Sequence, residues 1–154
     1  MAVTPPSAHC SEAESADLDQ LVELLALLFA QEAEFSPDGE KQLRALREIL
    51  ADRSLGRIYV AREAGRVVGM CSLLHTVSTA EGGKAAWLED LVVRPECRGR
   101  GIGRMLLEHA IGEARDEGVL RITLLSDAGN DRAHALYRKL GFDFSPMRPL
   151  RLKL

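Results

Sequence analysis

One segment constrains the fold more than any other, because it joins a strand, a glycine-rich loop and a helix within a short stretch. It spans Trp87 to Leu107 and has the sequence WLEDLVVRPECRGRGIGRMLL. The apolar run before Pro95 is typical of a strand, and a helix is predicted from about Ile102. Glycines stand at the junction, so backbone N–H groups there are free to point at a shared anion. Together with the partial positive charge of a helix N-terminus, this arrangement predicts a pyrophosphate site.

Three arginines, Arg98, Arg100 and Arg104, bring full positive charges to the same junction. Two widespread phosphate motifs are excluded. A Walker loop requires GxxxxGK followed by serine or threonine, and the sequence contains no such string. A dinucleotide fingerprint requires GxGxxG in the first strand–helix unit, whereas the GRGIG string here lies late in the chain. The alternative without a ligand is a glycine-rich helix entry surrounded by solvated arginines.

Before this segment, the pattern of apolar residues changes from helical to strand-like. A short strand at residues 8–12 is followed by an amphipathic helix at 17–34 and a second helix that starts at Ser36-Pro37-Asp38. Alternation and turn residues then predict antiparallel strands at 57–62, 66–75 and 85–93.

After the glycine-rich segment, helices and strands alternate. The predicted elements are a helix at 102–117 closed by Gly118, a buried strand at 119–125, a helix at 131–139 between Asn130 and Gly141, and one or two last strands within Phe142 to Leu152. This order predicts one α/β domain over residues 1–154, with a mixed, mostly antiparallel central sheet and helices on both faces.

Composition excludes several classes of protein. A net charge of −3 and 5% aromatic residues argue against nucleic-acid binding. The longest apolar run, Leu21 to Ala30, is too short to span a bilayer, and Met1 to Ser7 lacks the apolar core of a signal peptide. Three widely spaced cysteines and four unpaired histidines form no metal-binding pattern. We therefore expect a cytoplasmic protein without a metal.

Two stretches resemble the GNAT superfamily of N-acetyltransferases. Residues Arg98 to Gly103, RGRGIG, match the R-x-x-G-x-G signature of that superfamily, and NDRAHALYRKLGF at residues 130–142 continues the resemblance. The predicted order of elements is also similar to the GNAT order. Among the branches of the superfamily, the Glu-Asp-Leu string before the signature is most similar to the diamine and polyamine acetyltransferases.

The resemblance implies that acetyl-CoA is the cosubstrate. Its pyrophosphate would lie on the loop and helix start, and its pantetheine arm would pair with the edge of the preceding strand. It also implies contacts near the last helix. The residues implied are Arg98, Gly99, Arg100, Gly101, Ile102, Gly103 and Arg104 for the pyrophosphate, Leu91, Val92 and Val93 for pantetheine, and Asn130, Ala133 and Tyr137 near the last helix.

The resemblance also implies catalytic positions. Glu89 corresponds to a glutamate that accepts the amine proton, directly or through water; the alternative is a glutamate that only faces solvent. Tyr137 corresponds to the acid that protonates the leaving thiolate, although it also falls in an apolar helical stripe where it could serve packing alone. Strand alternation predicts that Asp90 points to the face opposite Glu89, unless a bulge disturbs the strand.

The acceptor is the least constrained part of the hypothesis. A small cationic amine is our first expectation, and a protein or peptide amine is the second. A third option is a CoA-sensing or interaction module without turnover. Glu32, Glu34 and Asp38, at the junction of the first two helices, lie where GNAT folds border the acceptor site, and the alternative is a solvated acidic turn. A homodimer is an expectation from the resemblance alone.

Overall fold

The computed structural model describes residues 7–154 as an α/β fold built on one sheet. Its elements, in chain order, are β1 (His9–Glu12), α1 (Leu18–Gln31), α2 (Gly39–Ala51), β2 (Gly56–Glu63), β3 (Arg66–Ser78), β4 (Gly83–Val93), α3 (Ile102–Asp116), β5 (Ile122–Leu124) and α4 (Asp131–Lys139). Short 3₁₀ turns at Ser15–Asp17 and Pro95–Cys97 precede α1 and the glycine-rich loop.

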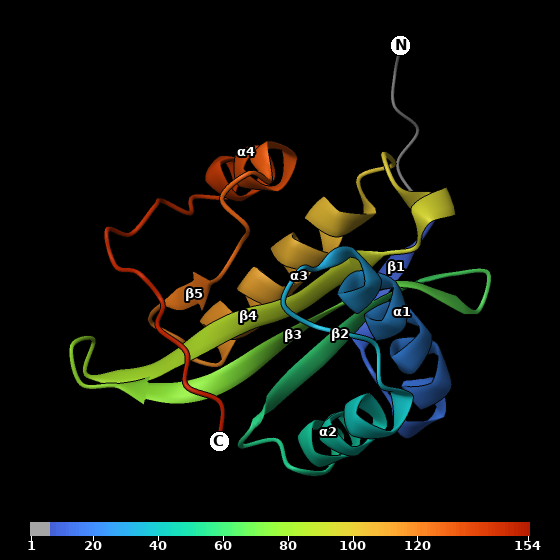
Figure 1. The fold of residues 1–154 in the computed structure, drawn as a ribbon, viewed down its shortest axis with the longest axis horizontal. Helices are drawn as coiled ribbons and strands as arrows, with labels where there is room; N and C mark the ends of the chain where they lie inside the picture. The colour runs from blue at the N-terminus through green and yellow to red at the C-terminus, as the bar shows by residue number, and fades with distance from the viewer. Residues whose placement is uncertain (1–6) are drawn as a thin grey trace.

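The five strands follow the order β1-β2-β3-β4-β5 across the sheet. The first three pairings are antiparallel, and only β4 and β5 are parallel. The prediction of a mixed, mostly antiparallel sheet is therefore confirmed. The parallel pair arises because α3 carries the chain from the end of β4 back to the start of β5 (Figure 1).

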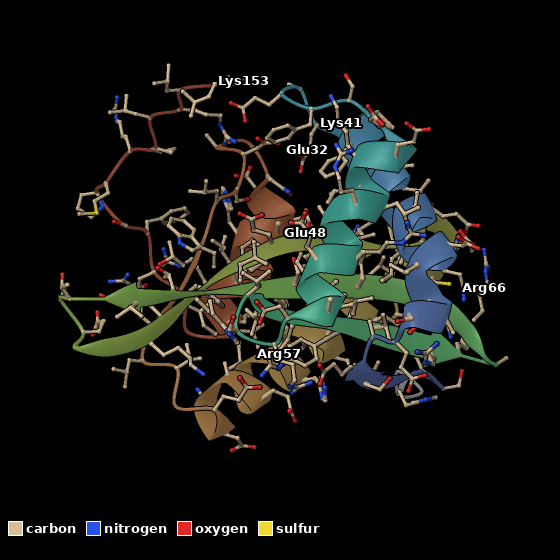
Figure 2. The ribbon with its side chains drawn as sticks, turned by 90° about the horizontal axis from the view of Figure 1, so that it is seen from below. Glu32, Lys41, Glu48, Arg57, Arg66 and Lys153 are labelled. Carbon is tan, nitrogen blue, oxygen red and sulfur yellow. The ribbon has the colours of Figure 1, made fainter. Side chains whose placement is uncertain are left out.

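Helices cover both faces of the sheet, as predicted. On one face, leucines of α1 and α2 pack against Ile58, Val60 and Met70. On the other, Leu106, Leu107 and other apolar residues of α3 pack against the opposite side of the same strands. Figure 2 shows α2 lying across the strands with α1 beside it. The two cores hold the sheet between them, so the strand ends that border the site are fixed from both sides.

The first two helices differ slightly from the prediction. Helix α1 ends at Gln31 rather than at residue 34, and α2 begins at Gly39, so Pro37 lies outside the helix. The reason for the later start is the Asp38 side chain, whose carboxylate accepts a hydrogen bond from the Lys41 backbone N–H at 3.2 Å. An aspartate in this role fixes the first turn of the helix after it.

Two predictions for the C-terminal part of the chain are wrong. The strand expected at 119–125 is only three residues long and half-buried, because β5 lies at the edge of the sheet and pairs only with β4; Leu120 is 56% exposed. The strands expected within Phe142 to Leu152 do not form in the described structure. Prolines at 146 and 149 lack a backbone donor, and Leu150 is 99% exposed.

In residues 7–154, no helix is long and apolar enough to cross a membrane.

Candidate functional site

The site begins where β4 and β5 separate. The two strands pair from Ala86 with Ile122 to Leu88 with Leu124, and no pairing continues beyond that point. Strand β4 runs on to Val93, while the chain leaves β5 toward α4 (Figure 1). The β5 side of β4 beyond Leu88 therefore has no strand neighbour among residues 7–154. Leu91, Val92 and Val93, the residues expected to pair with pantetheine, lie on this free stretch.

A bulge in β4 lies at the same place. Ser72 of β3 pairs with Glu89 and Met70 pairs with Val92, so the single residue between them on β3 faces both Asp90 and Leu91. Asp90 has φ +55°, a left-handed conformation that aspartate tolerates better than most residues. An extra residue of this kind reverses the alternation of the strand after it.

The bulge corrects the prediction for Asp90. Directly paired residues of neighbouring strands carry their side chains on the same face, so Ser72 and Glu89 share a face. The Ser72 hydroxyl lies 3.4 Å from Asp90 Oδ2 and 3.2 Å from the Glu89 carbonyl oxygen. Asp90 therefore does not point to the opposite face. It brings a second carboxylate to the face that carries Glu89.

Both carboxylates belong to a larger group of acids, which we call the acidic cluster. It comprises Glu32, Glu34, Glu89, Asp90 and Asp127. Burial, followed by the charges of Glu89 and Glu32, raises the pKa of Asp90 to about 6. Burial also raises the pKa of Glu32, with Asp127, Glu34 and Glu89 adding to the rise. Negative charges gathered around two buried carboxyl groups favour a cation among them.

The glycine-rich loop has the backbone geometry expected of an anion cradle. Gly99 and Gly101 have φ +74° and +81°, and a Cβ atom at either position would meet no atom within 4 Å. Helix α3 starts directly after Gly101, and no side chain caps its N-terminus. Its first N–H groups thus have neither an intrahelical partner nor a side-chain cap. These features fit a bound pyrophosphate.

The three arginines of the loop have protein partners instead of pointing freely at this space. Arg98 Nε donates to the Val93 carbonyl at 3.0 Å, and Arg104 Nε donates to Glu108 at 2.8 Å. Arg100 forms a two-point ion pair with Glu63, which lowers the pKa of Glu63 to about 2. The expected contribution of full charges is therefore reduced, and backbone groups are the main feature of the cradle.

Tyr137 lies on α4 and faces the α3-side core, near the bulge. Its pKa is raised by burial, and the Cys71 side chain, which lies directly opposite the bulge, adds to the rise. The Tyr137 hydroxyl has no hydrogen-bond partner in residues 7–154. Every side-chain nitrogen or oxygen that is fully enclosed in that part of the chain does have a partner. The hydroxyl is therefore not fully enclosed. It is a protonated donor on a side chain that packs against the α3-side core.

Asn130 and Ala133 lie at the start of α4. The Asn130 side-chain oxygen accepts a hydrogen bond from the Ala133 backbone N–H at 3.3 Å, so it caps the helix as predicted. The side-chain NH₂ group of Asn130 remains available to a ligand. Ala133 presents only a methyl group at this end of α4.

The two cysteines that border the site, Cys71 and Cys97, are both buried. Burial raises the pKa of the Cys71 thiol, so that it stays protonated, and Cys97 is buried beneath the loop. In the described part of the chain, no group of three or more histidine, cysteine, aspartate or glutamate residues could hold a metal ion.

Sequence reasoning placed Asp90 on the opposite face unless a bulge intervened, and it missed Asp127 and Ser72. The bulge that turns Asp90 depends on how two strands align, and Asp127 is brought to Glu32 only by the tertiary fold. The sequence reasoning also grouped Asp38 with Glu32 and Glu34. In the structure, the Asp38 carboxylate instead caps α2 and lies 3.7 Å from Lys41 Nζ. Only the aspartate's tolerance of left-handed backbone was a usable signal for the bulge.

This arrangement matches known proteins. The model of the acetyltransferase (GNAT) family matches residues 19–142. A solved integron cassette protein from the mobile metagenome of Cole Harbour Salt Marsh superposes with a TM-score of 0.82 at 28% identity, over 94% of this chain and 90% of that one.

Two curated relatives carry acetyltransferase names. Ribosomal protein bS18 alanine N-acetyltransferase of Salmonella typhimurium is 44% identical over 63 residues, which are 41% of this chain and 43% of that protein. Aminoglycoside N(6')-acetyltransferase type 1 of Stenotrophomonas maltophilia is 33% identical over 111 residues, 70% of this chain and 72% of that protein. The match thus spans less than half of the first relative and about seven tenths of the second.

Proposed function

This chain belongs to the acetyltransferase (GNAT) family, and we propose that it transfers the acetyl group of acetyl-CoA directly to a primary amine. The acceptor that we propose is a small cationic amine. The observation that carries this proposal is the bulge at Asp90, which places two carboxylates beside the free stretch of β4 and within the acidic cluster.

The glycine-rich loop supports the choice of acetyl-CoA. Two left-handed glycines and the uncapped start of α3 present backbone donors to an anion, as a pyrophosphate requires. The adjacent stretch of β4, free of a strand neighbour beyond Leu88, has backbone groups that can pair with the amides of pantetheine. A ligand held at both places would carry its thioester to the gap between β4 and β5.

The carboxylates support the proton transfer that the reaction requires. An alkyl ammonium has a pKa of about 10.4 and no lone pair, so it must lose a proton before it attacks the thioester carbon. We propose that Glu89 and Asp90 accept this proton, directly or through water. With a pKa of about 6, Asp90 is more basic than an ordinary carboxylate and is still ionised at neutral pH.

Tyr137 supports the departure of coenzyme A. After the amine nitrogen has bonded to the carbonyl carbon, the carbon–sulfur bond breaks and its electron pair leaves on sulfur. We propose that the Tyr137 hydroxyl donates its proton to that thiolate. Burial raises the pKa of this phenol, so it holds its proton until the thiolate forms.

The acidic cluster favours a small cation over a neutral acceptor, because an ammonium would offset the negative charges that, after burial, raise the pKa values of Glu32 and Asp90. Of the two named relatives, one has an aminoglycoside in its name and the other a ribosomal protein. A protein or peptide amine is therefore the second candidate acceptor. The match to the family as a whole does not single out the diamine and polyamine acetyltransferases among its branches.

We expect thiol release from acetyl-CoA to depend strongly on the charge of the acceptor. A panel should include butylamine, putrescine, an aminoglycoside, an uncharged aromatic amine and a peptide with a free N-terminus, each measured with a thiol reagent. Cationic small amines should give the highest kcat/KM. Faster release with the peptide than with any small amine would favour the second candidate, and a best acceptor without charge would contradict the role of the acidic cluster.

Replacement of each carboxylate should separate their roles. In the wild type, kcat/KM should fall below about pH 6, because the Asp90 carboxylate must be ionised to accept a proton. Asp90→Asn should abolish this fall. Glu89→Gln should lower kcat/KM most at neutral pH and recover partly at high pH, where free amine is abundant. Loss of a proton acceptor is expected to lower the rate by about 10²–10⁴-fold. A constant ratio of mutant to wild-type activity across pH would argue against proton transfer by that residue.

The same Asp90→Asn variant should be more stable than the wild type at neutral pH. The pKa of Asp90 is higher in the fold, about 6, than in the unfolded chain, about 3.9. Its contribution to stability is therefore full below the unfolded pKa and is lost as the pH rises through 6. Asparagine also tolerates φ +55° well. Thermal melts at pH 4 and pH 7.5 check this, with the gain in Tm expected only at the higher pH.

A further inference from the structure

A buried serine lies in the middle of the sheet, directly beside the bulge. Ser72 of β3 is 1% exposed and stands between Cys71 and Leu73, which are also buried. Its paired neighbour on β2 is Ile58, an apolar residue of the core under α1 and α2. A hydroxyl group buried among apolar side chains costs free energy unless it forms hydrogen bonds. The partners of the Ser72 hydroxyl therefore indicate its role.

Both partners of this hydroxyl belong to the bulge in β4. The Ser72 oxygen lies 3.2 Å from the Glu89 carbonyl oxygen and 3.4 Å from Asp90 Oδ2. A hydroxyl group has one proton to donate and lone pairs that accept. Ser72 can thus donate to only one of these oxygens at a time, and it can accept a hydrogen bond from Asp90 when that carboxyl group is protonated.

The two protonation states of Asp90 therefore require two orientations of one hydroxyl group. With Asp90 ionised, the Ser72 O–H donates to the carboxylate, because a charged acceptor forms the stronger hydrogen bond. With Asp90 protonated, the carboxyl O–H donates to Ser72 Oγ, and the Ser72 O–H turns to the Glu89 carbonyl. Asp90 thus keeps a hydrogen bond before and after it takes up a proton, without any movement of the backbone.

The other ionisable groups around Asp90 do not stabilise its negative charge. They are Glu89 on the same strand, Glu32 in the loop after α1 and the Cys71 thiol of β3. Among residues 7–154, Asp90 forms no ion pair. Burial, followed by the charges of Glu89 and Glu32, raises the pKa of Asp90, whereas the hydrogen bond from Ser72 lowers it. Ser72 therefore favours the ionised form, which is the form that can accept a proton.

We propose that Ser72 is a positioning residue for proton transfer, whose hydroxyl group holds the Asp90 carboxylate at the bulge and remains hydrogen-bonded to it in both protonation states. This inference rests on the proposed acetyl transfer, in which Asp90 accepts the amine proton. In that step an N–H bond of the ammonium breaks, its electron pair stays on nitrogen, and the proton passes to Asp90, directly or through water. Ser72 gives up no proton and only changes its acceptor.

Replacing Ser72 by alanine should raise the pH at which Asp90 titrates by about 0.5–1 unit, because the carboxylate loses a hydrogen bond. The carboxyl carbon-13 NMR signal of Asp90 gives this midpoint without turnover, and its absence from Asp90→Asn identifies it. Ser72→Thr keeps the hydroxyl group and should leave the midpoint near the wild-type value of about 6. Ser78→Ala is the matched control. It removes a second buried hydroxyl group of β3, which accepts from the Glu81 backbone N–H at 3.2 Å, and should not move the midpoint.

The kinetics should follow this titration. For a primary amine, kcat/KM of Ser72→Ala should fall about two- to fivefold at pH 6, where less of Asp90 is ionised, and should change little at pH 8. If the hydroxyl group only fastens the bulge through the Glu89 carbonyl, Ser72→Ala lowers Tm and leaves the Asp90 midpoint unmoved. That result would overturn the proposal, as would equal shifts in Ser72→Ala and Ser78→Ala.

The NMR titration also separates this inference from the proposed function. A raised midpoint in Ser72→Ala, without acetylation of any amine by the wild type, would support the role of Ser72 and contradict acetyl transfer. Acetylation of amines by the wild type, with an unmoved midpoint in Ser72→Ala, would contradict the role of Ser72 and leave acetyl transfer intact.

Discussion

Replacing Tyr137 by phenylalanine is expected to lower kcat by about 10²–10⁴-fold, the range for loss of a positioned general acid. Acetyl-CoA affinity should be nearly unchanged, because the substitution removes only a hydroxyl and keeps the ring against Phe142, 5.9 Å away between centroids. The free energy of unfolding should also change little, because the hydroxyl has no hydrogen-bond partner among residues 7–154 and its removal breaks no hydrogen bond there. Steady-state kinetics and thermal melts of the same preparation measure these effects together.

Tyr137→Ala is the matched control for packing. It removes the ring as well as the hydroxyl and should destabilise the fold by up to about 3 kcal/mol, as loss of a partly buried aromatic residue does. If Tyr137 serves packing alone, the phenylalanine variant keeps a near-normal kcat and only the alanine variant loses stability. That outcome would remove Tyr137 from the proposed mechanism and make the proton on the leaving thiolate come from solvent.

Gly101→Glu should weaken acetyl-CoA binding by about 10²-fold or more, because it places a like charge where the pyrophosphate is expected. Gly101 has φ +81° and no neighbour within 4 Å of its missing Cβ, so a side chain there extends into the open space above the start of α3. Calorimetry with acetyl-CoA measures the effect. Unchanged affinity in a folded Gly101→Glu protein would exclude this loop as the pyrophosphate site.

Two alanine variants separate charge from backbone strain. Gly101→Ala shares the strain of a left-handed residue, about 1–2 kcal/mol, but adds no charge. Gly103→Ala adds neither, because Gly103 is helical and its Cβ would make an ordinary contact with Val93 Cγ2 at 3.8 Å. Affinity should therefore fall in the order Gly103→Ala, Gly101→Ala, Gly101→Glu, with most of the loss in the last step.

The parts of the fold that depend on local chemistry were predictable from the sequence. Glycines mark the start and end of α3, and the left-handed Gly118 and Gly141 follow α3 and α4 as expected. Asn130 caps α4 through its side chain, which its position before Asp131 indicates. Each of these features is decided by residues within one turn of one another, so no knowledge of the tertiary structure was needed.

The features that depend on distant partners were not predictable. The sheet face on which the Asp90 side chain lies depends on the bulge, where one residue of β3, Cys71, lies opposite two residues of β4, Asp90 and Leu91. The alternating Leu150-Arg151-Leu152-Lys153-Leu154 suggests a strand, yet no neighbour pairs with it in residues 7–154. The acidic cluster draws its members from the loop after α1, from β4 and from the loop after β5, so only the fold brings them together.

The most direct test of the central claim is to measure free coenzyme A and acetylated amine in one reaction of this protein with acetyl-CoA and putrescine. Mass spectrometry identifies the amine product and a thiol reagent counts the coenzyme. Direct transfer predicts equal amounts of the two, both well in excess of the protein and both greatly reduced in Tyr137→Phe. Acetyl-CoA that binds the protein but remains intact with every amine offered would contradict the account and indicate a binding protein without turnover.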